Sequence, residues 1–358
     1  MNKRIKGFDF ARALAIFGMV LVNFKIVMNA TRGSEWLLSA VSLLEGRASA
    51  IFVILAGVGI TLMTGKARLS NDINMIRKNR LSLLKRSALL IFIGLLYSPV
   101  WPADILHFYG FYIAIAAFLF TVENRTLLLC ASGFMLGFVV LLLVMDYETG
   151  WNWDTLTYQD FWSAKGMFRH IFFNGFHPVF PWAAFLFIGL WLGRLDVSVY
   201  SVRRKLIIGS LLIWSCTELL SYLLIHFLSP DIPDLPSEII VFLLGTKPMP
   251  PMPQYIIASG SLAVLVISLS ISLTLRFSGN ILINALCKTG QISLTLYVSH
   301  VIIGMGFLEA IGRLENQSVE FSVMSSSVFA LCSVLFAHLW VSKLGTGPLE
   351  RVFRRFAS

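Results

Sequence analysis

Apolar residues run through this chain in long blocks, which short polar or basic stretches separate. A transmembrane helix needs about 20 mostly apolar residues in a row, with a range of about 17–25. Ten blocks approach that length, and they cover residues 8–28, 48–65, 87–101, 105–122, 127–146, 179–194, 206–228, 255–275, 289–309 and 321–343. We therefore expect an all-α, polytopic integral membrane protein with about ten transmembrane helices in one bundle.

The basic residues are distributed unevenly over the connections between these blocks. With the N-terminus in the cytoplasm, 21 of the 29 Lys and Arg residues fall on the cytoplasmic side and seven fall on the outer side. The remaining one, Arg12, lies inside the first block, and the largest group occupies residues 66–86. Because Lys and Arg are concentrated in cytoplasmic loops, this distribution predicts that both termini are cytoplasmic.

The composition excludes a soluble enzyme. Hydrophobic residues make up 57% of the 358 residues and charged residues only 13%, while the formal net charge is +10. Soluble domains contain about 45–50% apolar and about 25% charged residues. Membrane orientation accounts for the positive charge, so we expect membrane lipids and no nucleic acid as partners. The Cys and His spacings match no metal motif, and we expect no metal.

Two connections on the predicted outer side are too long to be simple turns. The first, about residues 147–178, is dense in aromatic residues, which is typical of an interfacial helix or a cap on the bilayer. The second, about residues 229–254, holds an apolar run too short to span a membrane. No internal repeat is visible, and we treat residues 1–358 as a single domain.

The first block contains ionisable residues, which are costly in a membrane unless they are paired or lie in a wet cavity. Asp9 and Arg12 are three residues apart, so they share one helical face and can pair. Arg12 is a candidate for holding a phosphate-bearing ligand from the cytoplasm, and a structural ion pair is the alternative. Asn23 ends the block on the outer side.

Two histidines are candidates for acid–base chemistry near the outer face. Asp104 and His107 are one helical turn apart, so the carboxylate can orient the imidazole. The alternative is a helix-capping Asp beside an interfacial His. His177 lies in a Gly- and Pro-rich turn, which favours it as a general base, with a structural His as the alternative. We expect His170 at the surface of the aromatic connection.

The ninth block carries several polar side chains. Tyr297 and His300 share a helical face, and His300 lies in the middle of the predicted span. An imidazole at that depth should face the interior of the bundle. Glycines four residues apart, such as Gly133/Gly137 and Gly189/Gly193, would allow helices to approach closely, unless they are ordinary membrane glycines.

Five sequence blocks carry a resemblance to a known family. They begin at Lys6-Gly-Phe-Asp9, Glu45-Gly-Arg47, Asp104-Ile-Leu-His107, Asn174-Gly-Phe-His177 and Gly290-Gln-Ile-Ser293, and the first continues through Arg12 to Asn23. Together the blocks resemble the transmembrane acyltransferase superfamily. They are most similar to its bacterial branch of membrane proteins related to heparan-alpha-glucosaminide N-acetyltransferase.

The resemblance implies transfer of an acyl group, typically acetyl from cytoplasmic acetyl-CoA or another acyl-CoA, to a sugar or glycan acceptor at the far side. It also implies that Asn23 is an active-site asparagine and that Arg12 lies near the acyl donor. Two departures stand out. Ala13 replaces the glycine of the family motif, and residues 24–47 contain no His, where the lysosomal enzyme has its catalytic one. The catalytic imidazole must come from elsewhere, and we favour His177 or His107.

The sequence therefore predicts a membrane-embedded O- or N-acyltransferase in the cytoplasmic (inner) membrane of a bacterium. The partners that we expect are an acyl-CoA and a glycan or other small-molecule acceptor, and a homodimer is left open. The alternatives are a transporter or exporter of a small anionic or lipid-linked solute, and a membrane scaffold. The candidate residues are Asn23, Asp104, His107 and His177 for catalysis, Asp9, Arg12, Tyr297 and His300 for the acyl donor, and Glu45 and Arg47 for the acceptor.

Overall fold

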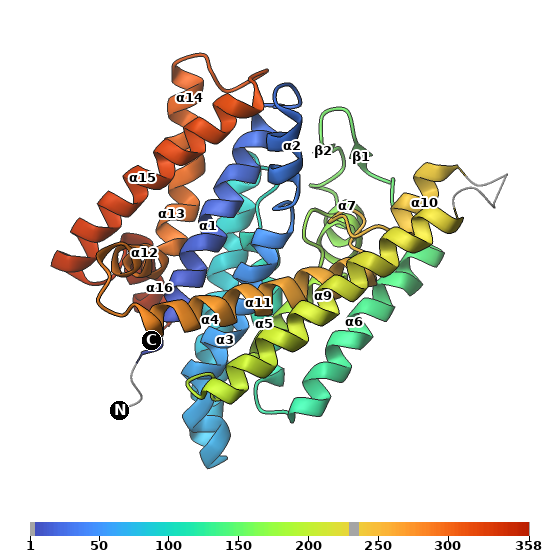
Figure 1. The fold of residues 1–358 in the computed structure, drawn as a ribbon. Helices are drawn as coiled ribbons and strands as arrows, with labels where there is room; N and C mark the ends of the chain where they lie inside the picture. Colours follow the sequence, from blue (N-terminus) through green and yellow to red (C-terminus); the bar gives the residue numbers. More distant parts are fainter. Residues whose placement is uncertain (1–3, 229–235, 358) are drawn as a thin grey trace. The chain divides into compact units, whose positions relative to one another are not determined.

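A computed structural model describes residues 4–228 and 236–357, and most of them are helical (Figure 1). The amino-terminal elements are α1 Lys6–Val27, α2 Glu35–Ser42, α3 Arg47–Ser70, α4 Ile73–Tyr97, α5 Leu106–Leu119 and α6 Asn124–Val144. The middle elements are β1 Trp151–Asn152, β2 Thr157–Tyr158, α7 Ala164–Arg169, the π-helix η1 His170–Asn174, α8 Val179–Leu192, α9 Tyr200–Leu228 and α10 Ser237–Leu244. The carboxy-terminal elements are α11 Pro253–Arg276, α12 Ile281–Gln291, α13 Ser293–Ser299, the π-helix η2 His300–Met305, α14 Gly306–Ala310, α15 Val319–Leu344 and α16 Pro348–Ala357.

The protein is an all-α integral membrane protein. Within the described ranges, seven helical segments are long and apolar enough to cross a membrane, and the number rises to eight if a bent pair forms one span. The seven are Lys6–Val27, Glu35–Ser70, Asn124–Val144, Tyr200–Phe227, Pro253–Arg276, Ser293–Ala310 and Val319–Leu344. The bent pair joins Ala164–Asn174 to Val179–Leu192 at an angle of 47°.

Three predicted spans are not among the seven. The predicted span 87–101 falls largely in the second half of α4, whose first half carries the cations of residues 77–86. The predicted spans 105–122 and 179–194 correspond to α5 and α8, which have only 14 residues each. The ninth block, 289–309, is helical but breaks at Ile292, where ψ changes to 31°. The count of ten spans and the cytoplasmic termini stay predictions.

Two compact units make up the described chain, and both are discontinuous in sequence. The first unit contains residues 4–52, 197–210 and 262–355. In this unit α1 packs against α12, α13 and α15, and Figure 1 shows these helices next to one another. Gly290 of α12 lies so close to α1 that an added Cβ would collide with the carbonyl oxygen of Asp9. The fully buried Ala13, which replaces the family glycine, lies beside the same contact.

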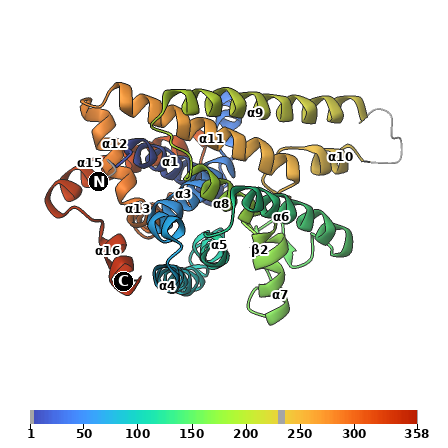
Figure 2. The same ribbon diagram turned by 90° about the horizontal axis from the view of Figure 1, so that it is seen from below.

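The second unit contains residues 53–196, 211–228, 236–261 and 356–357. Helix α4 packs along α5, and α6 packs along α8 (Figure 2). Helices approach each other closely at glycines, which have no side chain. An added Cβ on Gly189 would collide with the carbonyl oxygen of Ile54, and one on Gly193 would lie 2.8 Å from Thr61 Cβ, whereas one on Gly133 would meet nothing within 4 Å. The close approach predicted at Gly189/Gly193 is confirmed, and Gly133 is an ordinary membrane glycine.

The aromatic connection 147–178 is folded into several short elements. A two-stranded antiparallel hairpin pairs Trp151 with Tyr158, and α7 and η1 follow it. The aromatic rings pack on one another, so that Trp151 and Phe161 are buried. Of the second long connection, residues 229–235 lie outside the described residues, and the apolar run that follows forms the eight-residue helix α10.

Candidate functional site

Asn23 and His300 meet inside the first unit, although 277 residues separate them in the sequence. Asn23 lies near the end of α1 and His300 begins η2, and Asn23 Nδ2 lies 2.9 Å from His300 Nε2. The other ring nitrogen, Nδ1, contacts the carbonyl oxygen of Tyr297. An amide N–H donates to Nε2 and a carbonyl accepts from Nδ1, so the arrangement fits a neutral imidazole protonated at Nδ1. The fully buried imidazole therefore uses both of its nitrogens.

Asp9 is held by two arginines at the other end of α1. Arg4 donates from Nε and Nη2 to the two carboxylate oxygens at 2.8 and 2.9 Å, and Arg12 donates from Nη1 at 3.2 Å. The hydrogen bonds to Asp9 raise the pKa of Arg4. The pairing of Asp9 with Arg12 is confirmed, but the sequence did not single out Arg4. Arg12 and Asn23 are 11 residues apart on one helix, or about 16 Å along its axis.

Glu45 and Arg47 are oriented by different partners. Glu45 Oε1 accepts from Lys25 Nζ at 2.6 Å, and Lys25 is two residues after Asn23. Arg47 Nη1 donates to the carbonyl of Leu43 at 3.0 Å, one helical turn earlier. The structure therefore places Glu45 next to the end of α1 that carries Asn23.

Asp104 and His107 form the central pair of the second unit. Both side chains are buried, and Asp104 Oδ2 lies 3.2 Å from His107 Nδ1. The same carboxylate oxygen accepts from the backbone N–H of Leu106 at 2.9 Å, so Asp104 also caps the start of α5. His107 Nε2 is buried and has no hydrogen-bond partner among the described residues. The predicted orientation of the imidazole by a carboxylate is present, and so is the capping role that was its alternative.

His170 was expected at the protein surface, and that expectation is wrong. Its side chain is only 2% exposed, and its ring stacks on the ring of His107 with centroids 5.9 Å apart. Tyr158 and Phe161 contact the same imidazole, with centroids 4.6 and 4.9 Å away. The aromatic density of this connection, which predicted an interfacial cap, was the available signal for the burial of His170, because so many rings need partners to pack against.

His177 lies close to this cluster and is half-buried. Its ring packs against Trp182 and Phe108, and its carbonyl accepts a hydrogen bond from the Tyr112 hydroxyl. Nδ1 has no hydrogen-bond partner within residues 4–228 and 236–357, and the described contacts of the ring include no carboxylate. The structure thus brings His107 and His177 into one unit and gives the orienting acid to His107.

A polar brace holds the aromatic connection over the histidines. Arg169 donates to the carboxylate of Asp160 at 2.7 and 2.8 Å and to the hydroxyl of Tyr158 at 2.7 Å. Tyr158 in turn donates to the side-chain oxygen of Asn174 at 2.7 Å. Burial raises the pKa of Tyr158, although the charge and hydrogen bond of Arg169 oppose that shift. Next to the brace is a cavity of about 180 Å³, which Tyr158, Phe161 and His170 help to line.

Arg194, which follows the Gly189/Gly193 pair, has a structural role. It donates to the carbonyls of Phe120 and Val122 and to the side chain of Asn124, at distances from 2.7 to 3.1 Å. Burial and the nearby charge of Arg68 lower the pKa of Arg194 to about 10. The guanidinium therefore closes the turn between α5 and α6. Across the described parts of the chain, no group of three or more His, Cys, Asp or Glu residues could hold a metal ion.

Comparison with known families divides the chain into two matched parts. Residues 251–358 match a family of unknown function (DUF418), and this part contains Tyr297 and His300. No curated protein matches the chain. Residues 4–227, more than half of the chain, match the family described as "Heparan-alpha-glucosaminide N-acetyltransferase, catalytic". Asn23, Asp104, His107 and His177 all lie in this part, and the chain belongs to the heparan-alpha-glucosaminide N-acetyltransferase-like family of membrane proteins.

Proposed function

We propose that this protein transfers an acyl group, in the first place acetyl, from a cytoplasmic acyl-CoA to a hydroxyl or amine of a sugar, glycan or other small acceptor at the outer face of the membrane. The match to a family of catalytic acetyltransferase domains supports acyl transfer, and the apolar helices support a reaction inside the membrane. The basic excess on the predicted cytoplasmic side favours entry of a phosphate-rich donor there.

The observation that carries this proposal is the Asp104–His107 pair. A general base needs a proton-accepting atom that is free and a tautomer that is fixed. The carboxylate at 3.2 Å fixes the proton on Nδ1, and Nε2 of His107 is left without a partner in the described chain. Nε2 would remove the proton from the acceptor as its oxygen or nitrogen attacks the thioester carbonyl. CoA leaves as the thiol after the tetrahedral intermediate collapses.

The cavity of about 180 Å³ beside His170 is the proposed acceptor pocket. Its aromatic lining includes Phe161, Trp162 and Phe176, and the hydroxyls of Ser98 and Thr157 add polar groups. Flat apolar rings combined with a few hydroxyl groups suit a sugar ring, which has both C–H faces and O–H edges. The stacking of His170 on His107 connects this pocket to the proposed base.

The Asn23–His300 pair is the competing position for the reaction centre. Asn23 matches the active-site asparagine that the family resemblance implies, and His300 supplies an imidazole 2.9 Å from its amide. Here the Asn23 amide would have to leave Nε2 before that nitrogen could accept a proton. At this competing position, Asn23 would donate a hydrogen bond to the oxyanion that develops on the thioester carbonyl.

Transfer from radiolabelled acetyl-CoA to soluble glycan acceptors, measured with the protein in nanodiscs, tests the function and separates the two positions. We expect His107→Gln to lower turnover by about 10²–10⁴-fold, the usual contribution of a general base. The exposed His226 provides the matched control, and His226→Gln should retain wild-type turnover. Equal turnover for His107→Gln and wild type, with loss in His300→Gln, would move the base to His300. Absence of acyl-CoA binding and turnover would contradict the acyltransferase function itself.

A further inference from the structure

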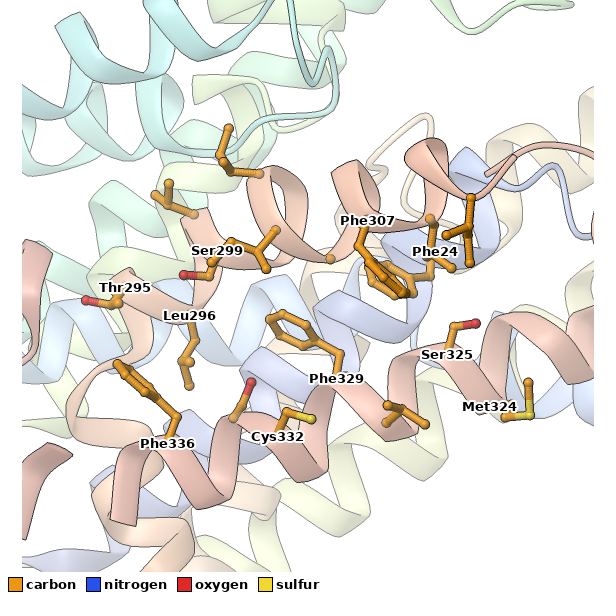
Figure 3. A pocket seen from close by; sticks show the side chains of 18 of the residues that line it. Phe24, Thr295, Leu296, Ser299, Phe307, Met324, Ser325, Phe329, Cys332 and Phe336 are labelled. Atoms are coloured by element: carbon orange, nitrogen blue, oxygen red, sulfur yellow. The ribbon is translucent and has the colours of Figure 1, made fainter. Parts of the chain in front are cut away.

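A second and much larger cavity lies in the first unit. Its volume is about 830 Å³, and it runs between α13, η2 and α14 on one side and α15 on the other. Figure 3 shows Phe307 and Leu296 on the first wall and Phe329, Cys332 and Phe336 on the second. We call this cavity the α13–α15 groove.

Small residues and a helical irregularity make the groove possible. Helix α15 lines the groove with the small residues Ser325, Cys332 and Ser333, where larger side chains would fill the space. On the opposite wall, η2 widens the helix from His300 to Met305. The floor is closed by Phe24 and Phe329, whose ring centroids are 6.2 Å apart.

The rim of the groove is apolar and accessible. Ile303 and Phe307 are 64% and 63% exposed, and Met324 and Val328 on the opposite rim are 56% and 57% exposed. Ser299, Ser325 and Ser333 belong to the lining, which otherwise consists almost entirely of hydrocarbon and aromatic side chains. A chain of methylene groups matches such a surface, because no polar group of the ligand has to be buried.

One end of the groove is bordered by cations. Pro348 and Leu349, which begin α16, line this end. Arg351 of α16 donates to the carbonyl of Leu344 at 3.3 Å, and Arg354 donates to the hydroxyl of Thr346 at 3.3 Å. Both guanidinium groups are therefore held over the turn between α15 and α16.

Two lysines add to the positive charge at this end of the groove, whereas the acid there already accepts hydrogen bonds. Lys288 donates to Ser342 at 2.7 Å, and Lys343 is the next residue of α15. Glu350 is the sole acid of residues 321–358, and its carboxylate accepts from the backbone N–H and the hydroxyl of Thr295. The two acids Glu309 and Glu320 belong to the helix ends at the opposite end of the groove.

We infer that the α13–α15 groove binds an anionic glycerophospholipid, with its acyl chains along the aromatic walls and its phosphate at the cations of α16. The position of the charges favours this ligand. The apolar α13–α15 groove ends at the cations Arg351, Arg354, Lys288 and Lys343, so it is complementary to an amphiphile with a negative head. A neutral lipid would use the walls only. Each Lys or Arg close to an anionic lipid surface adds to the affinity, so the headgroup selects the lipid.

Native mass spectrometry of the protein in neutral detergent, titrated with phosphatidylglycerol or with phosphatidylcholine of the same chains, tests this inference. We expect tight retention of one phosphatidylglycerol and at least tenfold weaker retention of phosphatidylcholine. The double variant Arg351→Gln/Arg354→Gln should weaken phosphatidylglycerol binding by about 10- to 30-fold. Lys205→Gln is the control for the loss of an exposed cation in the same unit and should bind like wild type.

A second pair of variants tests the groove itself. Cys332 is exposed and lines the groove, so the larger side chain of Cys332→Phe should fill the groove and abolish retention of the lipid. Leu335→Phe, on the same helix but outside the lining, should leave it unchanged. Equal binding of both lipids, full binding by Cys332→Phe, stronger binding of a polyprenyl phosphate, or a dimer that forms in place of lipid binding would each overturn the inference.

Discussion

At the scale of single residues, Asp104 has two structural roles that substitutions can separate. Its carboxylate orients His107 and also accepts hydrogen bonds from the first backbone N–H groups of α5. Asn caps helices about as well as Asp, but as a neutral amide it cannot stabilise the imidazolium that forms during proton transfer. The two roles therefore predict different effects for replacement of Asp104 by Asn and by Ala.

We expect Asp104→Asn to keep the thermal stability of wild type and to lower acetyl transfer by about 10²-fold or more. Asp104→Ala should lose the same activity and in addition about 0.5–2 kcal/mol of stability, because the cap is gone. Melting followed by circular dichroism, together with the radiolabel assay, measures both effects. Full activity in Asp104→Asn would leave Asp104 with a capping role only.

The Asn23–His300 hydrogen bond makes a second prediction at this scale. Asn23→Leu leaves a buried ring nitrogen of His300 without its partner, which costs about 1–3 kcal/mol. The double variant Asn23→Leu/His300→Leu should lose less than the sum of the single variants, with an interaction energy of about 0.5–3 kcal/mol. Denaturant unfolding in mixed micelles measures this cycle. Strict additivity of the two single effects would show that the contact contributes nothing.

At the scale of helices, the position of His107 depends on Gly94. Helices α4 and α5 cross so closely that an added Cβ on Gly94 would collide with the backbone nitrogen of His107 and lie 2.8 Å from its Cα. Overpacking of this kind costs about 1–3 kcal/mol when the backbone has to shift. A shift of α5 moves the imidazole together with Asp104, so the pair would move as one body.

We expect Gly94→Ala to lower both the melting temperature and the acetyl-transfer rate. Gly133→Ala on α6 is the matched control, because its Cβ would meet nothing within 4 Å, and it should resemble wild type in both measurements. A Gly94→Ala protein with the activity and stability of wild type would contradict the close crossing of α4 and α5.

Contacts within one helix could be predicted from the sequence, whereas contacts between distant segments could not. Pairs within one helical turn, such as Asp9–Arg12 and Asp104–His107, were predictable because the geometry of a single helix determines them. The Asn23–His300 contact was not, since no local rule links residues that are 277 positions apart. His170 was misplaced because a local pattern reports aromatic density but not which rings enclose which side chain.

For the whole molecule, the distribution of cations predicts which connections face the cytoplasm. We expect a single cysteine at exposed Ser70, in a background without the four native cysteines, to be protected from an impermeant maleimide in intact cells. A cysteine at exposed Asp154 of the aromatic connection should be labelled under the same conditions. Labelling at both positions, or at Ser70 alone, would contradict the predicted orientation.

The course of the chain through the first unit has a consequence for any attempt to divide the protein. The part that matches the catalytic family ends at residue 227, but α1 from that part is covered by α12 and α15 from the other. A fragment that ended at residue 227 would expose the face of α1 that α12 and α15 bury. The boundary between the two families is therefore not a boundary between independently folding pieces. In chimaeras with related proteins, the exchange of carboxy-terminal parts will succeed only where the incoming part brings a partner for Asn23.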